Sequence, residues 1–450
     1  MRVTHRFDGC WELSQVEPHA GYSARTMQRV LRGLGWAIAS GYCLLALWVN
    51  VALYTLPGPD DELEDLLGRQ AALERELEFE DAGAEMQRLF PEGFIFVNVL
   101  YGLTWTQIAL REDCAQACED RSLDEARWAL AQLESREGTR PFEASLCPDH
   151  GVFHAGWTNY LRASIVEAAG SESPPKERAA LRDGSAAIAA CFAQSETPFL
   201  ESYRGMVWPA DSVVAMASLG LHDALLEPRY VELRQIWVEA VRARLDGATG
   251  LVAHSSRAGD GATLQPPRGS STALMVGFWP QIDEAFARQQ LAAFEDQFEM
   301  TRFGLPAIRE YPSSHSGHAD VDSGPVVFGV GFSADIVAVR ALRAHGRVEA
   351  ARQLSAPIHA FGFQTGGREA HYLGGALPVA DAFIAWSRAQ AVLVSAQDAK
   401  EQRKVWWGFH LLSLLPLLAG LALWRARSRE ARRVHVPGPR SSRSPEAPGA

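Results

Sequence analysis

The chain has 450 residues, of which 47% are hydrophobic, and it carries a formal net charge of −11. This length suits one large domain or two to three average ones, and the apolar content is sufficient for a sizeable core. The acidic balance argues against a nucleic-acid partner. The sequence contains neither a glycine-rich phosphate loop nor a dinucleotide-binding fingerprint, so we expect no cofactor.

The first distinctive segment is GLGWAIASGYCLLALWVNVALYTL, residues 33–56, which contains no charged residue. It is long enough to span a bilayer. Arg25, Arg29 and Arg32 precede it, and the acidic run DDELED follows it. The positive-inside rule therefore predicts that residues 1–32 are cytoplasmic. A signal peptide is the alternative, although no small-residue cleavage site follows in TLPGPDDE.

A second uncharged segment, VWWGFHLLSLLPLLAGLALW, occupies residues 405–424 and is followed by the basic run RARSREARR. Tryptophans at both of its ends are typical of membrane interfaces. We therefore expect a two-pass membrane protein with both termini cytoplasmic and residues 57–404 outside the cytoplasm. Residues 425–450 form a basic tail whose Pro/Ser/Arg-rich end is typical of disorder. The alternative is that both segments are buried helices of a soluble protein.

Six loops between these segments share one character: each mixes glycine or proline with charged and aromatic residues, and each precedes a helical pattern. They are centred on Glu92, Gly151, Gly205, Arg268, Asp322 and Leu377. Successive centres lie 54 to 63 residues apart. Such a regular spacing indicates a repeated supersecondary unit.

Each interval holds an apolar helical pattern followed by an amphipathic one, as in FIFVNVLYGLTWTQIAL and then SLDEARWALAQLES. A helix that is apolar all round is buried, whereas an amphipathic helix has one exposed face. The sequence therefore predicts an all-α domain of about twelve helices, arranged as an (α/α)6 toroid. An open solenoid is the alternative, but it would need polar capping repeats, and the last apolar helix, PVADAFIAWSRAQAVL, favours closure.

In a toroid the six loops meet at one end of a central funnel, so their side chains are candidates for a site. The candidate catalytic acids are Asp322, Glu201, Asp211, Asp320 and Glu310. Two carboxyl groups at a suitable distance can serve as general acid and base, and they can dehydrate an alcohol or hydrolyse a glycosidic bond. Structural roles are the alternative: an aspartate before a helix can cap it, Asp211 can favour the helix dipole, and Glu310 can form a surface ion pair.

The same loops supply candidate ligand-binding side chains, namely Trp157, Tyr203, Arg204, Trp208, Arg268, Tyr311 and His318. A concave site with convergent carboxylates and aromatic rings suits a small-molecule or saccharide ligand. A non-catalytic ligand-binding or sensor domain is a second hypothesis, because a binding site needs rings and hydrogen bonds but no essential acid.

Four cysteines lie between the two apolar segments: Cys114, Cys118, Cys147 and Cys191. An exported domain can form disulfides, and four cysteines allow three pairings. A metal site that combines Cys114 and Cys118 with nearby histidines would match no standard zinc spacing. We therefore expect no metal.

The runs PADSVVAMASLGLHDALLEPRYVELRQIWVEAVRARLDGATGLVAH and DVDSGPVVFGVGFSADIVAVRALRAHG resemble the linalool dehydratase/isomerase family, over about residues 90–390. The resemblance implies an (α/α)6 barrel and lyase or isomerase chemistry on an alcohol-like substrate. It also places the family's catalytic cysteines at Ala210 and near Glu201, and its histidine near Trp157, so those residues do not match. The leading hypothesis is a membrane-tethered acid–base lyase, hydratase or isomerase, and the alternative is a carbohydrate-active toroid.

Overall fold

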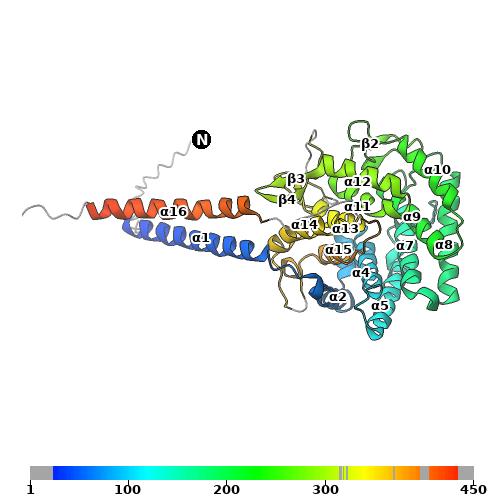
Figure 1. Ribbon diagram of the computed structural model, residues 1–450, viewed down its shortest axis with the longest axis horizontal. Helices are drawn as coiled ribbons and strands as arrows, with labels where there is room; N and C mark the ends of the chain where they lie inside the picture. Colours follow the sequence, from blue (N-terminus) through cyan, green and yellow to red (C-terminus); the bar gives the residue numbers. More distant parts are fainter. Residues whose placement is uncertain are drawn as a thin grey trace, which may run out of the picture. The chain divides into compact units, whose positions relative to one another are not determined.

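A computed structural model describes residues 24–313, 317, 319–320, 323–367, 370–395 and 405–433. The chain divides into two units, residues 49–413 and the two ends of the chain on either side of them. The described residues are mostly helical and include three short two-stranded antiparallel sheets (Figure 1). The predicted predominance of helix is confirmed.

The apolar segments near the two ends differ in length. Helix α1 (Ala24–Ala52) contains the stretch Gly33–Ala52, which is long and apolar enough to cross a membrane. Helix α16 (Trp407–Arg433) contains a shorter apolar stretch, Trp407–Ala422. A bilayer crossing takes about 20 residues, and arginines begin at Arg425. Among the described residues, therefore, one helix and not two has the length and composition of a membrane span.

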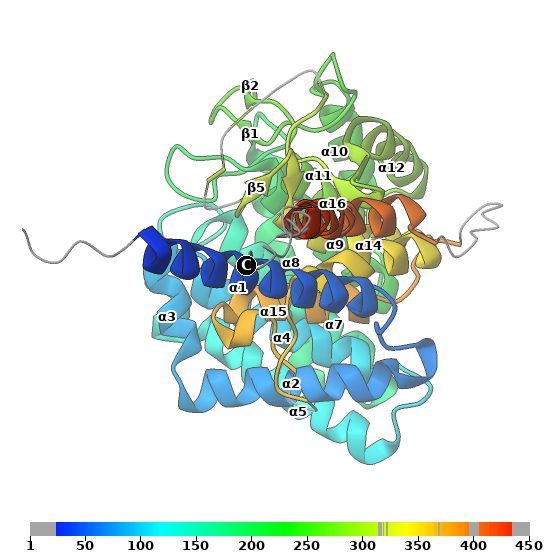
Figure 2. The ribbon, with the colours of Figure 1, turned by 90° about the vertical axis from the view of Figure 1, so that its left-hand side faces the viewer.

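Six helices form an inner ring in the larger unit. They are α4 (Gly93–Ala109), α7 (Gly151–Ala169), α9 (Pro209–Leu225), α11 (Gly269–Phe278), α13 (Phe332–Ala344) and α15 (Pro378–Ala389). Each of them packs against the next, and α15 packs against α4, so the ring is closed. Figure 2 shows α15 and α4, the last and first inner helices, side by side. This closure distinguishes a toroid from an open solenoid, as the sequence predicts.

Six further helices pack outside this ring, one against each inner helix. They are α2 (Glu62–Phe79), α5 (Gln116–Glu134), α8 (Pro175–Gln194), α10 (Val231–Arg242), α12 (Glu284–Phe298) and α14 (Val348–Phe361). Inner helix α4 buries all of its residues except Phe96 and Gln107, whereas outer helix α10 buries Trp237, Val238 and Val241. The alternation of fully apolar and amphipathic patterns therefore corresponds to the inner and outer rings.

The remaining helical pieces are short. They are η1 (Pro59–Asp61), α3 (Ala82–Leu89), α6 (Arg136–Thr139), η2 (Gly170–Glu172), η3 (Trp279–Gln281) and η4 (Leu373–Gly375).

Three hairpins interrupt the connections between outer and inner helices. They pair β1 (Ser255–Ser256) with β2 (Thr263–Gln265), β3 (Glu299–Arg302) with β4 (Leu305–Ile308), and β5 (Val326–Val327) with β6 (Val330–Gly331). From the sequence, the fifth inner helix is expected to begin directly after the run DVDSGP. The last hairpin occupies that place instead, because two β-branched valines flank a Phe328–Gly329 turn, and α13 begins at Phe332.

Aromatic rings fill the axis of the toroid. Trp157 lies edge-on to Phe278 and to Trp386, with ring centroids 5.6 and 5.8 Å apart. The guanidinium of Arg340 lies 4.0 Å from the centre of the Phe278 ring and 4.4 Å from that of Trp386. These edge-to-face and cation–π contacts are favourable geometries. The centre of the ring is therefore a packed core.

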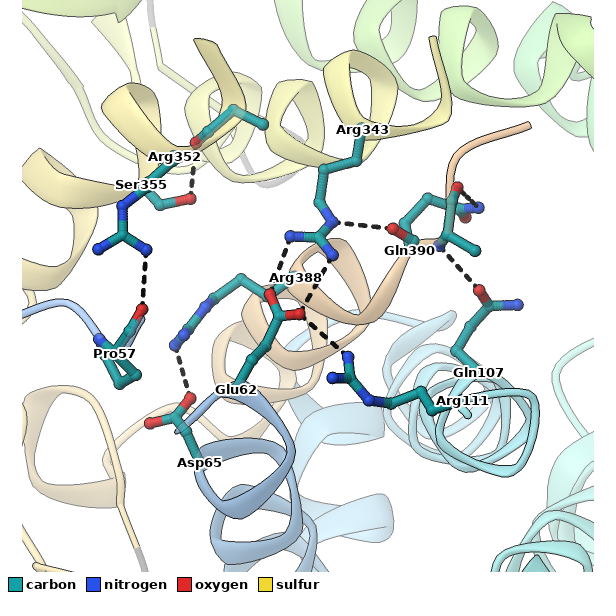
Figure 3. Close-up of polar contacts among 12 residues, drawn as sticks. Pro57, Glu62, Asp65, Gln107, Arg111, Arg343, Arg352, Ser355, Arg388 and Gln390 are labelled. Carbon is teal, nitrogen blue, oxygen red and sulfur yellow. Dashed lines mark hydrogen bonds and ion pairs between the residues drawn. The ribbon is translucent and has the colours of Figure 1, made fainter. Parts of the chain in front are cut away.

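Ion pairs join the first outer helix to the last inner helices (Figure 3). Glu62 of α2 accepts hydrogen bonds from Arg343 of α13 at 2.9 Å and from Arg111, just after α4, at 3.0 Å. One turn further along α2, Asp65 lies 2.7 Å from Arg388 of α15. Glu62 and Arg343, and Asp65 and Arg388, thus join the beginning of the ring to its end, although each pair is separated by more than 250 positions in the chain.

Candidate functional site

The loops that precede the inner helices meet at one end of the toroid, which we call the mouth. Hydrogen bonds connect neighbouring loops: Val152 N–H donates to Glu201 O, Ser256 N–H to Val207 O, and Gly269 N–H to Glu310 O. A fourth bond, from the Tyr203 hydroxyl to Glu92, connects the loops before α9 and α4, which are not neighbours in the ring. The loops before α4, α7, α9, α11 and α13 therefore lie together around the mouth. The sequence predicts this convergence from the spacing alone.

In the loop before α9, two of the candidate residues stabilise the loop itself. Glu201 accepts a hydrogen bond from the backbone N–H of Gly205, which has a φ of 74° that favours glycine. Arg204 donates to Glu143 at 2.8 Å and is mostly exposed. These contacts close a tight turn, and they leave the arginine at the outer edge of the mouth.

The same loop carries an aromatic cluster. The hydroxyl of Tyr203 donates to the Glu92 carboxylate at 2.6 Å. Its ring stacks on Phe142 and lies edge-on to Trp208, with centroids 5.4 and 6.0 Å apart. The rings are thus held in place beside a carboxylate, which is an arrangement that can bind a ligand with both hydroxyl groups and apolar faces.

A second cluster joins the loops before α11 and α13. Arg268 donates two hydrogen bonds to the carboxylate of Asp320, at 2.6 and 2.8 Å, and a third to Glu310 at 2.9 Å. The hydroxyl of Ser270 also donates to Glu310, at 2.8 Å. The guanidinium lies 5.4 Å from the centre of the Tyr311 ring. One arginine therefore holds two of the five candidate acids.

The two acids on Arg268 have pKa values displaced in opposite directions. Burial raises the pKa of Glu310, which is fully buried, against the opposing effects of Arg268 and Ser270. Burial also acts to raise the pKa of Asp320, but hydrogen bonds from Arg268 and the Ser323 backbone outweigh it and hold that pKa well below its usual value. The Asp320 side chain is 47% exposed. Asp320 thus faces solvent as a stable anion, and Glu310 lies behind the arginine.

His254 borders the same cluster. Its Nε2 lies 3.4 Å from Arg268, and its Nδ1 lies 3.0 Å from the hydroxyl of Ser271. Burial and the adjacent arginine lower the pKa of His254 to about 4. The imidazole is therefore neutral at physiological pH.

Three inner helices place a buried aspartate in their first turn, and each binds the loop that precedes its helix. Asp211 accepts from the Ser202 hydroxyl at 2.5 Å, Asp335 from the Ile308 N–H at 2.6 Å, and Asp381 from the Tyr372 N–H at 2.8 Å. The shared geometry indicates a structural role that recurs around the ring.

Beside α15 lies a cluster that contains none of the candidate residues above. Glu76 of α2 is 3.1 Å from His371, and burial, with the charges of Asp381 and Glu80, raises its pKa to about 7. Burial raises the pKa of Asp381 to about 6. No pattern in the sequence singles out Glu76, because it is one of many acids in the charged helix DELEDLLGRQAALERELE.

The remaining candidate residues lie elsewhere. Trp157 is fully buried in the aromatic core of the axis and not at the mouth. Asp322 and His318 lie outside the described residues.

The cysteines of the larger unit are paired, Cys114 with Cys118 and Cys147 with Cys191. The described part of residues 57–395 therefore offers no free thiol for the cysteine chemistry of the family that the sequence resembles. Among the described residues, no group of three or more histidine, cysteine or acidic side chains is placed to hold a metal ion.

Comparisons with known proteins give a likeness to solved structures and to no family model. No family model and no curated protein matches the chain. A glycoside hydrolase family 76 α-mannanase from Bacteroides thetaiotaomicron is similar in structure, with a TM-score of 0.40 and 14% identity, over 66% of this chain and 85% of the mannanase. A likeness at this level says nothing about what this chain binds or does, so the proposals below rest on the geometry of the mouth.

Proposed function

We propose that residues 57–404 form an extracytoplasmic, membrane-tethered domain that binds a saccharide at the mouth of the toroid and acts on it by acid–base chemistry. The Arg268 cluster carries this proposal. Carboxyl groups whose surroundings displace their pKa values, next to aromatic rings, mark a candidate functional site.

The residues around Arg268 suit a polyhydroxylated ligand. The exposed Asp320 carboxylate can accept hydrogen bonds from sugar hydroxyls, and its negative charge can stabilise positive charge that develops on a sugar ring. Tyr311, Tyr203 and Trp208 supply rings for the apolar faces of the sugar. Glu310 acts as a positioning residue, because its contact with Arg268 fixes the guanidinium that holds Asp320.

The test is turnover of an oligosaccharide panel by the full chain, measured as release of reducing ends. We expect Asp320→Asn to lower turnover by about 10²-fold or more, as general acid–base and electrostatic groups contribute. Asp260→Asn is the matched control, because Asp260 also pairs with an arginine, Arg257 at 2.8 Å, on an exposed turn. Equal turnover of the two variants would contradict the proposed role of Asp320.

Asp322 is the second proposed acid or base, on the evidence of the sequence alone. Asparagine caps helices about as well as aspartate. Asp322→Asn should therefore keep the melting temperature while it lowers turnover by about 10²–10⁴-fold. Normal turnover would leave Asp322 with a capping role.

Ligand binding without catalysis is a second candidate function, and the extensive pairing of the mouth acids favours it. Glu201, Asp211, Glu310 and Asp320 all accept hydrogen bonds from protein groups. In that case a saccharide would bind to the chain with no turnover, and Asp320→Asn would change the Kd alone.

We also propose that the chain is tethered through Gly33–Ala52 and that residues 405–424, despite the shorter apolar stretch of α16, cross the membrane a second time, which places both termini in the cytoplasm. Two disulfides in the larger unit support an oxidising compartment. A reporter that is active only outside the cytoplasm should be active when inserted near residue 260 and inactive when fused after Ala450. Activity at Ala450 would contradict the two-pass arrangement.

A further inference from the structure

Two exposed phenylalanines occupy the turns of neighbouring hairpins in a backbone conformation that rarely suits them. Phe303 and Phe328 have φ values of 52° and 54°, and each is followed by a glycine with positive φ. Their side chains are 50% and 67% exposed. Glycine, asparagine or aspartate would fit such turns with less strain. The requirements of the fold therefore do not explain the aromatic rings.

The two rings form one joint feature. They lie edge-to-face with centroids 5.2 Å apart. A bridge between Arg309 and Val330 holds the β3–β4 and β5–β6 hairpins together. Phe361, the last residue of α14, and Phe363, two residues beyond it, are 39% and 40% exposed. We call Phe303, Phe328, Phe361 and Phe363 the aromatic rim.

The aromatic rim adjoins the point where the apolar span of α1 ends. Leu305, two residues after Phe303, packs in one buried cluster with Val49, Ala52 and Leu53. A side chain on Gly304 would come within 2.7 Å of the backbone of Phe409, and the Phe361 ring lies 6.1 Å from the Phe409 ring. A residue that packs against the last turn of a membrane span lies close to the membrane interface.

We propose that the aromatic rim inserts into the headgroup layer of the membrane that α1 crosses, so that the lipid surface is its partner. This inference rests on the proposed tether. Aromatic rings are favoured at the membrane–water interface, where their apolar faces leave water. Burial of the rings in the headgroup layer would offset two unfavourable contributions to the free energy: the exposure of the rings to water and the positive φ values of Phe303 and Phe328.

The consequence reaches the mouth of the toroid. The backbone carbonyl of Gly329, next to Phe328, accepts a hydrogen bond from the N–H of Glu310. The turn of the β5–β6 hairpin is thus hydrogen-bonded directly to Glu310, a member of the Arg268 cluster. Seating the aromatic rim on the bilayer would hold this side of the mouth at the lipid surface, which favours a saccharide that is itself attached to, or gathered at, the membrane.

The test measures the depth of spin labels on the full chain in nanodiscs of phosphatidylcholine and phosphatidylglycerol. In a Cys10→Ser, Cys43→Ser background, labels are placed at Phe328→Cys or Phe303→Cys. The control is Leu264→Cys, because Leu264 is also exposed, at 56%, but lies on strand β2 of another hairpin and outside the cluster that packs Leu305 against Val49. We expect labels at 328 and 303 to collide several-fold more with oxygen, relative to a water-soluble nickel chelate, than the label at 264.

Two outcomes would overturn the inference in distinguishable ways. Labels at 328 and 303 that are as accessible to the nickel chelate as the label at 264 would refute insertion of the aromatic rim and leave the tether intact. Release of the unlabelled chain from membranes by alkaline extraction would refute the tether, and this inference with it.

Discussion

The charged residues at the mouth show how one residue type serves different purposes a few positions apart. Asp211 is buried and binds the Ser202 hydroxyl, whereas Asp320 is half exposed and binds Arg268. Both precede or begin an inner helix, so the sequence alone could nominate both. The exposure of each carboxylate and its hydrogen-bond partners in the structure distinguish Asp211, which stabilises a loop, from Asp320, which is open to a ligand.

Arg268 should be strongly coupled to the acid behind it. Arg268→Met would leave Glu310 buried without its cation, and loss of one partner of a buried pair costs about 3–5 kcal/mol. We expect the double variant Arg268→Met, Glu310→Leu to recover much of the unfolding free energy measured by chemical denaturation. A double variant no more stable than Arg268→Met would show that the two residues act independently.

Glu76 should destabilise the protein at alkaline pH. Its folded pKa of about 7 lies above the ordinary value of 4.5, so the folded state resists its ionisation, and stability falls as pH rises between these values. Glu76→Gln removes this penalty. Thermal unfolding should show the variant melting a few degrees above the parent at pH 8 and close to it at pH 4.5. A constant difference at both pH values would contradict the raised pKa.

At the scale of elements, the helices were predictable and the hairpins were not. Apolar and amphipathic periodicity extends over ten or more residues, which is enough to identify α4 or α5 from the sequence. Strands β5 and β6 have two residues each, too few for any alternation to be recognised. Their pairing depends on tertiary contacts, such as the bridge between Arg309 and Val330.

Close helix packing depends on one glycine in α9. A Cβ atom at Gly220 would lie 1.9 Å from the backbone oxygen of Gln281, which cannot move aside easily. We expect Gly220→Ala to destabilise the protein by about 1–3 kcal/mol, as overpacking does. Gly247→Ala is the control, because nothing lies within 4 Å of a Cβ atom there. Equal unfolding free energies for the two variants would show that η3, which contains Gln281, moves aside to make room for the methyl group without loss of stability.

At the scale of the whole molecule, the sequence predicted a ring but not the contacts that close it. The 54–63-residue spacing gives six units, and the apolar last helix favours closure. No local pattern pairs Asp65 with Arg388, because these residues are more than 300 positions apart and each belongs to an ordinary charged helix. The two expected membrane spans are a second example. Both were nominated because they contain no charged residue, but only the apolar stretch of α1 is long enough, among the described helices, to cross a membrane.

Asp65 is the residue on which we expect closure of the ring to depend most. Its carboxylate binds Arg69 at 2.9 Å and Arg388 at 2.7 Å, and all three side chains are buried. Burial acts to raise the pKa of Asp65, but the two arginines outweigh it and lower the pKa. A lowered folded pKa contributes stability above the unfolded value, near 3.9, that is lost as pH falls below it.

Asp65→Asn should therefore cost about 3–5 kcal/mol at pH 7, because two buried cations lose their anion. The difference from the parent should shrink as pH falls below about 4, where this carboxylate begins to protonate in the unfolded state of the parent while the folded state still keeps it ionised. Chemical denaturation at pH 7 and pH 3.5 measures both values. Hydrogen exchange should also show faster opening of α2, which these pairs hold against α15. Glu85→Gln is the control, since Glu85 pairs with Arg88 in an exposed position and such pairs contribute about 1 kcal/mol or less. An Asp65→Asn protein as stable as this control would mean that apolar packing between α15 and its neighbours α2 and α4 closes the ring without the ion pairs.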